Sequence, residues 1–376
     1  MRIVTLLPSL GVGGAEKQAL AVAKRMTKRG HSVAVLVLMP RKVEEWPTAI
    51  EPIFLGIRKT PASVLTGLFR ARRFLREFRP DLVHSHSFPA NLFARLLKLL
   101  VPRIAVLSTV HNVYEGRWWR MAAYRLTDGL SRRTVAVSEA AAQRFVRLKA
   151  VPRRKCTVVP NGIDSDGFAP DGGRRTRVRA EMGVADAEAT AEFVWIAIGR
   201  IAPAKDYPNL LRAFAEVHGL RPYARLWIAG EMPKSGIAEL QTLCGELGIG
   251  NEVRWLGLRR DLPALLDAAD AFVLGSAWEG MPLAVGEAMA MQKPVVATDV
   301  GGVRELVGNA GVVVEAKNSK ALAEAMLAKM NQGRESLAAE GRFARERVTR
   351  HFSIDAAADV WEALYRSLIG STAGDF

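Results

Sequence analysis

The 376-residue chain is predicted to be an α/β protein with two doubly wound domains in tandem. The chain is longer than an ordinary single domain and has the length expected of two domains. Short apolar runs alternate with helical patterns, and this alternation stops at one polar stretch and then starts again. With 49% apolar and 24% charged residues, the composition is that of a folded globular protein.

The first half contains short apolar strands separated by helical segments. We expect strands at residues 2–7, 32–38, 82–84, 104–108, 134–137 and 157–159, and helices at 14–27 and 64–79. Strands that alternate with helices form parallel sheets covered by helices. The first half is therefore expected to be a Rossmann-like domain.

The domain boundary is expected where a stretch rich in Gly, Asp, Arg and Ala begins, at residues 164–190. Strands then resume at 193–198, 225–229, 253–256, 271–274, 295–297 and 311–314. The expected domains are 1–165 and 166–350, with 351–376 forming a C-terminal helix that returns to the first domain. Doubly wound domains bind ligands at the carboxyl ends of their strands, which predicts a cleft shared by the two domains.

We expect a helix to begin within the segment from Gly280 to Ala284, after the strand at 271–274. Pro282 suits the first turn of a helix. The amides that would then point at an anion, with the helix dipole behind them, belong to Met281, Leu283 and Ala284. The alternative is a capped surface helix without a ligand.

Two glutamates flank this expected helix start, and each can accept hydrogen bonds from hydroxyl groups. Glu287, one turn into the helix, can accept two hydrogen bonds from a ribose diol. Glu279, in the preceding loop, can reach the hydroxyls of a sugar. The two carboxylates are eight residues apart.

The string Glu279 to Glu287 resembles the Glu-x7-Glu signature of glycosyltransferase family 4. Further strings agree with that family in order and spacing, at residues 11–16, 109–112, 137–139, 159–164, 198–200 with Lys205, 256–257 and 298–305. The resemblance covers almost the whole chain. It implies the GT-B fold, a nucleotide diphosphate sugar as donor, and transfer with retention of configuration. The N-terminal domain would bind the acceptor and the C-terminal domain the donor.

The resemblance assigns roles to two further groups in the second domain. Arg200 and Lys205 follow its first strand, where two fixed cations stabilise the charge of a departing diphosphate. In the similar enzymes this pair acts without a divalent metal, and we expect no cofactor here. Leu258 and Arg259 correspond to the loop that contacts the nucleobase. A solvated surface pair is the alternative for the two cations.

The glycine-rich loop at residues 11–14 is open to two interpretations. A strand before it and a helix after it are typical of a dinucleotide fingerprint. However, Glu16 stands where the third glycine is expected, and only Arg41 supports an NADP-dependent oxidoreductase. In the resembling family, Gly13 and Gly14 approach the donor diphosphate and the acceptor, which we favour.

Three histidines lie near the expected ends of strands in the first domain. By resemblance, His111 contacts the transferred sugar and helps to stabilise its cationic transition state. His84 and His86 share a face of an extended segment, but no third metal ligand is evident. They are expected to line the acceptor side or to be structural.

The net charge of +15 is unevenly distributed. Residues 1–170 hold 29 basic and 11 acidic residues, whereas the remainder holds 24 and 27. A basic first half indicates an anionic partner, such as a membrane surface, a phosphorylated glycolipid or nucleic acid. Nucleic acid is not expected, because no helix-turn-helix, RNA-recognition or zinc motif is present.

The expected location is the cytoplasm, at the inner face of the plasma membrane. Two scattered cysteines indicate a reducing compartment, and neither a signal peptide nor a membrane span is evident. On a helical projection of residues 64–79, Leu65 and Phe69 lie among arginines, away from the core face. Such a helix can dock on an anionic membrane, and a solvated helix is the alternative.

The predicted function is therefore retaining, metal-independent hexosyl transfer from a UDP- or GDP-sugar to a glycan or lipid-linked acceptor, as in cell-surface polysaccharide or lipopolysaccharide synthesis. The alternatives are an NADP-dependent oxidoreductase, a basic nucleic-acid-binding protein, and another GT-B activity such as a phosphorylase or sugar-nucleotide epimerase.

Overall fold

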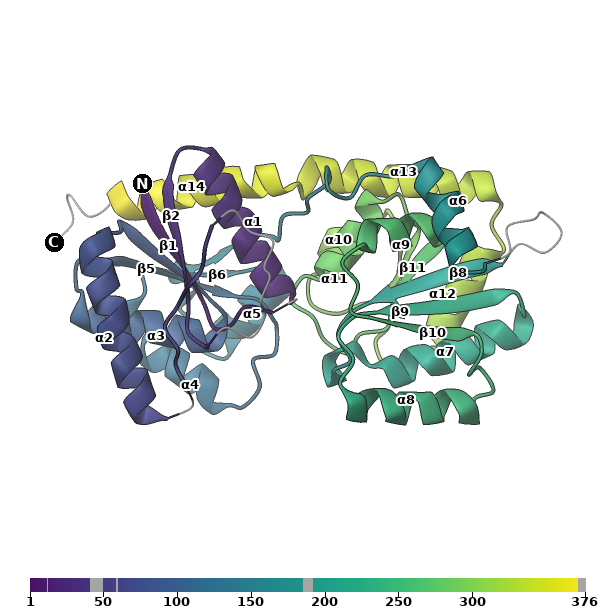
Figure 1. Cartoon of the computed structure of the whole chain (residues 1–376), viewed down its shortest axis with the longest axis horizontal. Helices are drawn as coiled ribbons and strands as arrows, with labels where there is room; N and C mark the ends of the chain where they lie inside the picture. Colours follow the sequence, from purple (N-terminus) through teal and green to yellow (C-terminus); the bar gives the residue numbers. More distant parts are fainter. Residues whose placement is uncertain (12, 41–49, 59, 185–191, 371–376) are drawn as a thin grey trace. The chain divides into compact units, whose positions relative to one another are not determined.

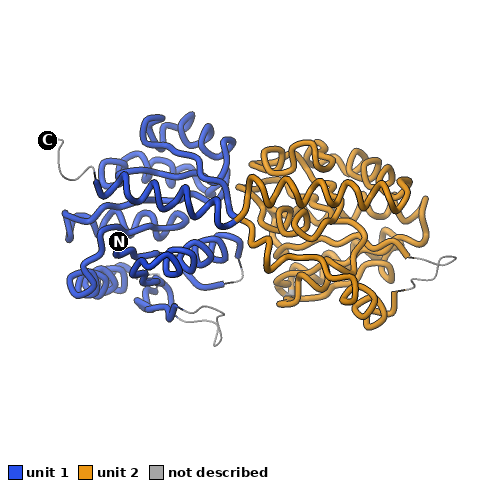
Figure 2. Tube along the Cα trace, turned by 90° about the horizontal axis from the view of Figure 1, so that it is seen from above, with its two compact units in different colours: residues 1–162, 354–376 blue, residues 163–353 orange. Residues whose placement is uncertain are grey.

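The computed structural model describes residues 1–11, 13–40, 50–58, 60–184 and 192–370. Val12 and Arg41, which bear on the dinucleotide alternative, lie outside this part. The chain forms two compact units, which are coloured separately in Figure 2. Unit 1 comprises residues 1–162 and 354–376, and unit 2 comprises residues 163–353. The sequence-based boundaries lay at residues 165 and 350.

Unit 1 is built on a parallel sheet that has, within the described residues, the strand order β3-β2-β1-β4-β5-β6-β7 (Figure 1). Its strands are β1 (Arg2–Leu7), β2 (Ser32–Val37), β3 (Ile53–Phe54), β4 (Leu82–His86), β5 (Ala105–Val110), β6 (Arg133–Ala136) and β7 (Cys156–Val158). The sequence did not predict β3, because two residues are too short to show an alternating pattern.

Helices cover both faces of this sheet. Successive strand residues point to opposite faces, and apolar residues on each face pack against a different set of helices. Val4 and Leu6 pack with α2 (Pro61–Phe78) and α3 (Ser87–Leu100). Ile3 packs in a separate cluster with α1 (Gly14–Lys28) and α14 (Ile354–Gly370). The remaining α-helices described in unit 1 are α4 (Trp119–Leu126) and α5 (Glu139–Arg147).

The last helix, α14, belongs to the core of unit 1 although it comes from the far end of the chain. The chain enters unit 2 after Gly162 and leaves it before Ile354. A Cβ on Gly162 would lie 2.7 Å from the Cα of Ile354, so only glycine permits this close approach. Trp361 and Tyr365 of α14 are almost fully buried.

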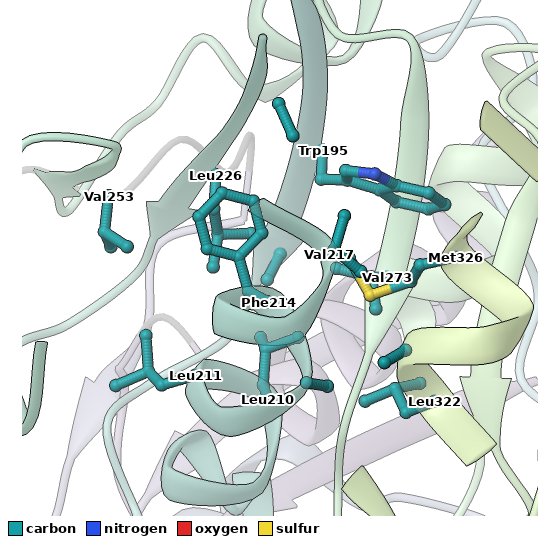
Figure 3. Close-up of a cluster of buried hydrophobic side chains, with 14 of the residues drawn as sticks. Trp195, Leu210, Leu211, Phe214, Val217, Leu226, Val253, Val273, Leu322 and Met326 are labelled. Carbon is teal, nitrogen blue, oxygen red and sulfur yellow. The ribbon is translucent and has the colours of Figure 1, made fainter. Parts of the chain in front are cut away.

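Unit 2 repeats the architecture with the order β10-β9-β8-β11-β12-β13, again with parallel pairs. Its strands are β8 (Phe193–Ile198), β9 (Ala224–Ala229), β10 (Val253–Gly257), β11 (Ala271–Leu274), β12 (Val295–Thr298) and β13 (Val312–Val314). Its described α-helices are α6 (Gly172–Glu181), α7 (Tyr207–Leu220), α8 (Lys234–Glu246), α9 (Leu262–Ala268), α10 (Leu283–Ala290), α11 (Val303–Val307), α12 (Ser319–Met330) and α13 (Arg334–His351). Figure 3 shows one buried cluster, in which Phe214 of α7 and Met326 of α12 pack beneath Trp195 of β8.

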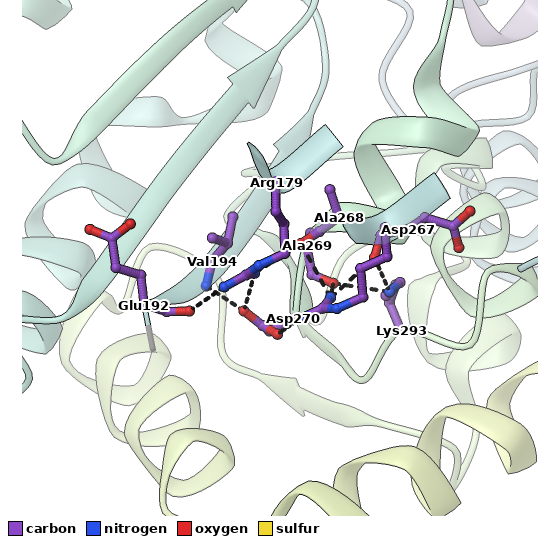
Figure 4. Close-up of polar contacts among 9 residues, drawn as sticks. Arg179, Glu192, Val194, Asp267, Ala268, Ala269, Asp270 and Lys293 are labelled. Carbon is purple, nitrogen blue, oxygen red and sulfur yellow. Dashed lines mark hydrogen bonds and ion pairs between the residues drawn. The ribbon is translucent and has the colours of Figure 1, made fainter. Parts of the chain in front are cut away.

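Helix α6 lies in the stretch to which the sequence assigned no element. Arginines hold it in place, and Arg175 donates to the carbonyls of residues 267–269, at the end of α9. Arg179 is buried and bonds both the Ala268 carbonyl and the Asp270 carboxylate (Figure 4). Because these contacts are polar, a search for apolar periodicity misses the helix.

Candidate active site

The loops after β8 and β11 flank the point where the strand order of unit 2 changes direction. β8 continues to β9 on one side, and β11 lies on its other side. At such a switch point, parallel sheets leave room for a ligand beyond the carboxyl ends of the strands. Arg200 and Lys205 follow β8 and Glu279 follows β11, so the topology brings these loops together.

Lys205 and Glu279 form an ion pair in this loop cluster. The Lys205 ammonium donates to Oε1 of Glu279 at 2.6 Å, and the Ser276 hydroxyl donates to the same oxygen at 2.7 Å. The N–H of Ala277 donates to the carbonyl of Ala204 at 2.8 Å and ties the two loops together. Two groups that the sequence assigned separately, one to a diphosphate and one to a sugar, are thus direct partners.

Two neighbours of this pair were missed by sequence analysis. Ser276 carries no motif of its own, and only its spacing of three residues before Glu279 could have pointed to it. Tyr207 is buried and donates to the carbonyl of Gly199 at 2.6 Å. Burial, and then the charge of Glu279, raise the pKa of Tyr207 above its ordinary value. Tyr207 therefore stays a hydrogen-bond donor at neutral pH.

The loop that carries Glu279 rests on the segment after β12. Thr298 donates to the carbonyl of Ser276 at 2.7 Å, and the N–H of Gly302 donates to the carbonyl of Gly280 at 2.7 Å. Gly301 has a φ of 56°, and a Cβ there would collide with the carbonyl oxygens of Glu279 and Gly280. Gly301, in the string 298–305, therefore permits this contact.

The helix α10 begins beside Glu279. Its N-cap is Pro282, with an extended backbone, so Pro282 lies one residue before the helix and not in its first turn as expected. Leu283 and Ala284 are the first two helical residues, and their N–H groups have no carbonyl one turn earlier in the helix. Glu287 lies one turn in and is buried, as is Met281.

The other donor-side residues lie on neighbouring loops. Arg200 is exposed and forms no ion pair among the residues that the structure describes. Leu258 is 53% exposed just after β10. Arg259 forms a two-point ion pair with Asp261 at 2.7 and 2.5 Å, which raises the pKa of the guanidinium. Contact of this loop with a nucleobase stays a prediction.

Unit 1 has its own switch point between β1 and β4. Gly13 is the N-cap of α1 and Gly14 its first residue, directly after the loop that follows β1. His86 ends β4, and His111 follows β5. The Nδ1 of His86 and the Nε2 of His111 are 3.0 Å apart, a hydrogen-bond distance.

His84 also lies on β4, but both of its ring nitrogens are hydrogen-bonded to buried side chains of unit 1. Its ring nitrogens bond the hydroxyls of Tyr365 and Thr109, each at 2.7 Å. Desolvation by burial lowers the pKa of His84 to about 3 and that of His111 to about 4, and holds the pKa of His86 well below its usual range. All three rings are therefore neutral at pH 7. Among the described residues, no group of three or more His, Cys, Asp or Glu side chains is arranged to hold a metal ion.

Comparison with known proteins identifies the family. A family model described as "Glycosyltransferase Family 4" matches residues 12–166, and one described as "Glycosyl transferases group 1" matches residues 192–332. The D-inositol 3-phosphate glycosyltransferase of Mycolicibacterium smegmatis is 36% identical over 337 residues, which cover 81% of this chain and 75% of that protein. The chain belongs to glycosyltransferase family 4.

Two further relatives of this family 4 glycosyltransferase are also glycosyltransferases by name. The UDP-Gal:α-D-GlcNAc-diphosphoundecaprenol α-1,3-galactosyltransferase of Escherichia coli is 26% identical over 260 residues, which cover 65% of this chain and 64% of that protein. The lipopolysaccharide core biosynthesis mannosyltransferase LpsB of Rhizobium meliloti is 30% identical over 291 residues, which cover 75% of this chain and 76% of that protein.

The fold of this family 4 glycosyltransferase is GT-B. The crystal structure of Anabaena HepE, which contains UDP and glucose, superposes with a TM-score of 0.84 at 22% identity, over 97% of this chain and 99% of that chain. The prediction of two Rossmann-like domains of the GT-B type is confirmed. Family membership also favours glycosyl transfer over the oxidoreductase and nucleic-acid-binding alternatives.

Proposed function

We propose that the protein is a retaining hexosyltransferase that moves a sugar from a nucleoside diphosphate to a glycan or lipid-linked acceptor. The observation that carries this proposal is the convergence of Lys205, Ser276 and Glu279 at the switch point of unit 2. This cluster offers a cation to a diphosphate and a carboxylate to sugar hydroxyls, beside the N-terminus of α10.

In this proposal the donor diphosphate lies against the amides of Leu283 and Ala284, and Glu287 accepts the ribose hydroxyls. Arg200 and Lys205 stabilise the charge that develops as the sugar–phosphate bond breaks. Since Lys205 is already paired with Glu279, an incoming diphosphate competes for the ammonium and frees the carboxylate to bind the sugar.

Retention follows from a front-face reaction. The bond from the anomeric carbon to the phosphate oxygen breaks while the acceptor oxygen bonds to the same face, and the acceptor proton passes to the departing phosphate. Glu279 then orients the sugar and forms no covalent bond to it. His111, neutral because burial lowers its pKa to about 4, does not repel a sugar ring that becomes cationic.

Donor binding is tested with Glu287→Ala by calorimetric titration of UDP and GDP. Loss of hydrogen bonds to a charged acceptor should cost roughly 1.5–3 kcal/mol, or about 10- to 150-fold in Kd. Glu324→Ala, an exposed glutamate on α12, is the matched control. Unchanged affinity of Glu287→Ala for the preferred nucleotide would remove Glu287 from the site.

Catalysis is tested by turnover with the preferred donor, found by screening hydrolysis of nucleotide sugars. Lys205→Ala and Arg200→Ala should lower kcat more than they raise KM, because both act on charge that grows in the transition state. EDTA should leave activity intact. Loss of activity in EDTA, restored by magnesium or manganese, would contradict metal independence.

A lipid-linked acceptor is supported by the surface of unit 1. In α2, Leu68, Ala71 and Leu75 pack in the core, whereas Leu65 and Phe69 are 56% and 61% exposed. Exposed apolar side chains among arginines are what an interfacial helix presents to lipid. Among the described residues, no helix is long and apolar enough to cross a bilayer.

Membrane docking is tested by co-sedimentation with vesicles of neutral or anionic lipid at low and high salt. Arg73→Glu/Arg76→Glu/Arg79→Glu reverses exposed charges on α2 and at its C-cap, and should abolish binding to anionic vesicles. The control is Arg334→Glu/Arg342→Glu/Arg350→Glu, an equal change of charge on exposed positions of α13. Equal loss in both variants, or equal binding to neutral vesicles, would contradict docking through α2.

A further inference from the structure

The hydrogen bond between His86 and His111 joins the candidate catalytic histidine to a second ring that the proposed function does not use. His86 Nδ1 and His111 Nε2 are 3.0 Å apart, and the ring centroids are 5.2 Å apart. The opposite nitrogens, His86 Nε2 and His111 Nδ1, are buried and have no hydrogen-bond partner among the described residues. Each ring of the bonded pair thus has one nitrogen without a hydrogen-bond partner among the described residues.

When two neutral imidazoles share one hydrogen bond, the tautomer of one ring fixes the tautomer of the other. One ring must donate an N–H and the other must accept with a lone pair. If His111 Nε2 carries the proton, its Nδ1 presents a lone pair. If His86 Nδ1 carries it, His111 Nδ1 becomes a donor. The proton on this single bond therefore decides what His111 offers to a substrate.

We propose that His86 is a positioning residue that fixes the tautomer of His111. In this arrangement His111 Nε2–H donates to His86 Nδ1, and His111 Nδ1 keeps a lone pair that can accept a hydrogen bond from a hydroxyl of the transferred sugar. A lone pair suits a hydroxyl of a ring that becomes electron-poor, whereas an N–H would place positive charge beside it. The inference rests on the proposed role of His111 in sugar transfer.

His86 is itself held in place by buried neighbours. The ring of His84 lies 4.0 Å from the ring of His86, centroid to centroid, and 4.6 Å from that of Trp361 in α14. His84 is fixed in turn by the hydroxyls of Thr109 and Tyr365. This packing limits rotation of the His86 ring, so its Nδ1 stays directed at His111.

The first experiment observes the bond directly. In the full chain with 15N-labelled histidine, long-range 1H–15N spectra should show His111 with a protonated Nε2 and an unprotonated Nδ1. A 15N–15N coupling across the hydrogen bond should link His111 to His86. A His111 ring protonated on Nδ1, or one without that coupling, would overturn the inference.

The second experiment compares substitutions in the active enzyme. His86→Phe keeps a ring but removes the acceptor, so His111 should show both tautomers and kcat should fall up to about tenfold, the worth of one hydrogen bond. His86→Asn places an amide near the former Nδ1 and should restore one tautomer and part of kcat. Nucleotide affinity, which depends on unit 2, should not change in either variant.

Two controls separate the outcomes. His351→Asn, on the exposed surface of α13, should change neither kcat nor the His111 spectrum. If His111→Ala leaves kcat unchanged, the proposed role of His111 fails. If His111→Ala lowers kcat but His86→Phe changes neither kcat nor the tautomer of His111, the inference about His86 alone is overturned.

Discussion

Two separate reasons disfavour a side chain at position 301, which is a glycine: the backbone conformation and the lack of space for a Cβ. Its φ of 56° disfavours any residue with a Cβ, and that Cβ would also collide with the backbone under Glu279. Gly248, in the same unit, has a similar φ of 68° but open space around the missing Cβ. The two positions therefore separate backbone strain from displacement of the loop.

We predict that Gly301→Ala weakens nucleotide-sugar binding and lowers kcat, because it pushes Glu279 away from Lys205 and Ser276. Gly248→Ala should cost only about 1 kcal/mol of stability through its positive φ, with activity unchanged. Urea denaturation and steady-state kinetics of both variants check this. Equal kinetic effects in the two variants would show that strain alone is responsible.

The three neutral histidines predict acid sensitivity. Their pKa values are lowered by burial, to about 4 for His111, whereas an unfolded histidine titrates near 6.5. Between these values the unfolded state binds more protons, so stability falls as the pH falls from about 6.5. For His111 alone, the loss between pH 7 and pH 4.5 should be on the order of 2 kcal/mol.

This loss is measured as the free energy of unfolding in urea at pH 7, 5.5 and 4.5. His111→Gln cannot titrate, so its stability should decline less steeply with acid than that of the wild type. His351→Gln, at an exposed site, should follow the wild type. Parallel curves for the wild type and His111→Gln would refute the assignment.

At the scale of elements, α6 shows how a helix can be held mainly by charge. Its buried Arg179 and half-buried Arg175 bind the end of α9, where Lys293 also donates to the carbonyls of Asp267 and Ala269. Cations at a helix C-terminus meet both unpaired carbonyls and the negative end of the dipole. Burial lowers the pKa of Lys293 to about 8.

We predict that Arg179→Ala destabilises unit 2 by about 3 kcal/mol, because it removes a buried guanidinium that donates to the carbonyls of Ala268 and Glu192 and pairs with the half-buried Asp270. Arg177→Ala, on the same helix, removes only an exposed pair with Glu181 and should cost less than about 0.5 kcal/mol. Thermal and urea denaturation of both variants provide the measurement. Similar losses in the two would contradict a special contribution of the buried Arg179.

The elements differ in how far the sequence could predict them, and the difference has a physical basis. β1, β8 and β11 were predicted at their observed bounds because each is a continuous buried run. α6 was missed because arginine side chains and not apolar stripes hold it. The pairing of Lys205 with Glu279 was also missed, since 74 residues separate them and only sheet order brings them together.

At the scale of the whole molecule, unit 1 is assembled from two distant parts of the chain. Helix α14 packs in one core cluster with strands of the sheet. This cluster contains Ile3, Leu82 and Leu107 of the strands and Ile354, Ala358, Trp361, Tyr365 and Leu368 of α14. Ion pairs between α1 and α14, such as Arg25 with Asp355 at 2.7 Å, add to this contact. Unit 2 is continuous in sequence.

We therefore predict that residues 163–353 fold as a separate chain and that residues 1–162 do not. Without α14, the first fragment exposes one face of its sheet and leaves the buried His84 without its Tyr365 partner. Addition of a peptide of residues 354–370 should restore a dispersed NMR spectrum to that fragment. A folded 1–162 fragment in the absence of the peptide would contradict the prediction.

The discontinuity of unit 1 also sets an order of events on the ribosome. Residues 1–162 are synthesised before α14. Until α14 has been made, one face of their sheet stays uncovered and the core of unit 1 cannot be completed. Unit 2 is complete before that moment and can fold while the earlier segment is still immature. Of the two units, the one whose synthesis begins earlier is thus the one completed later, and during that interval its uncovered sheet face is exposed to aggregation and to chaperones.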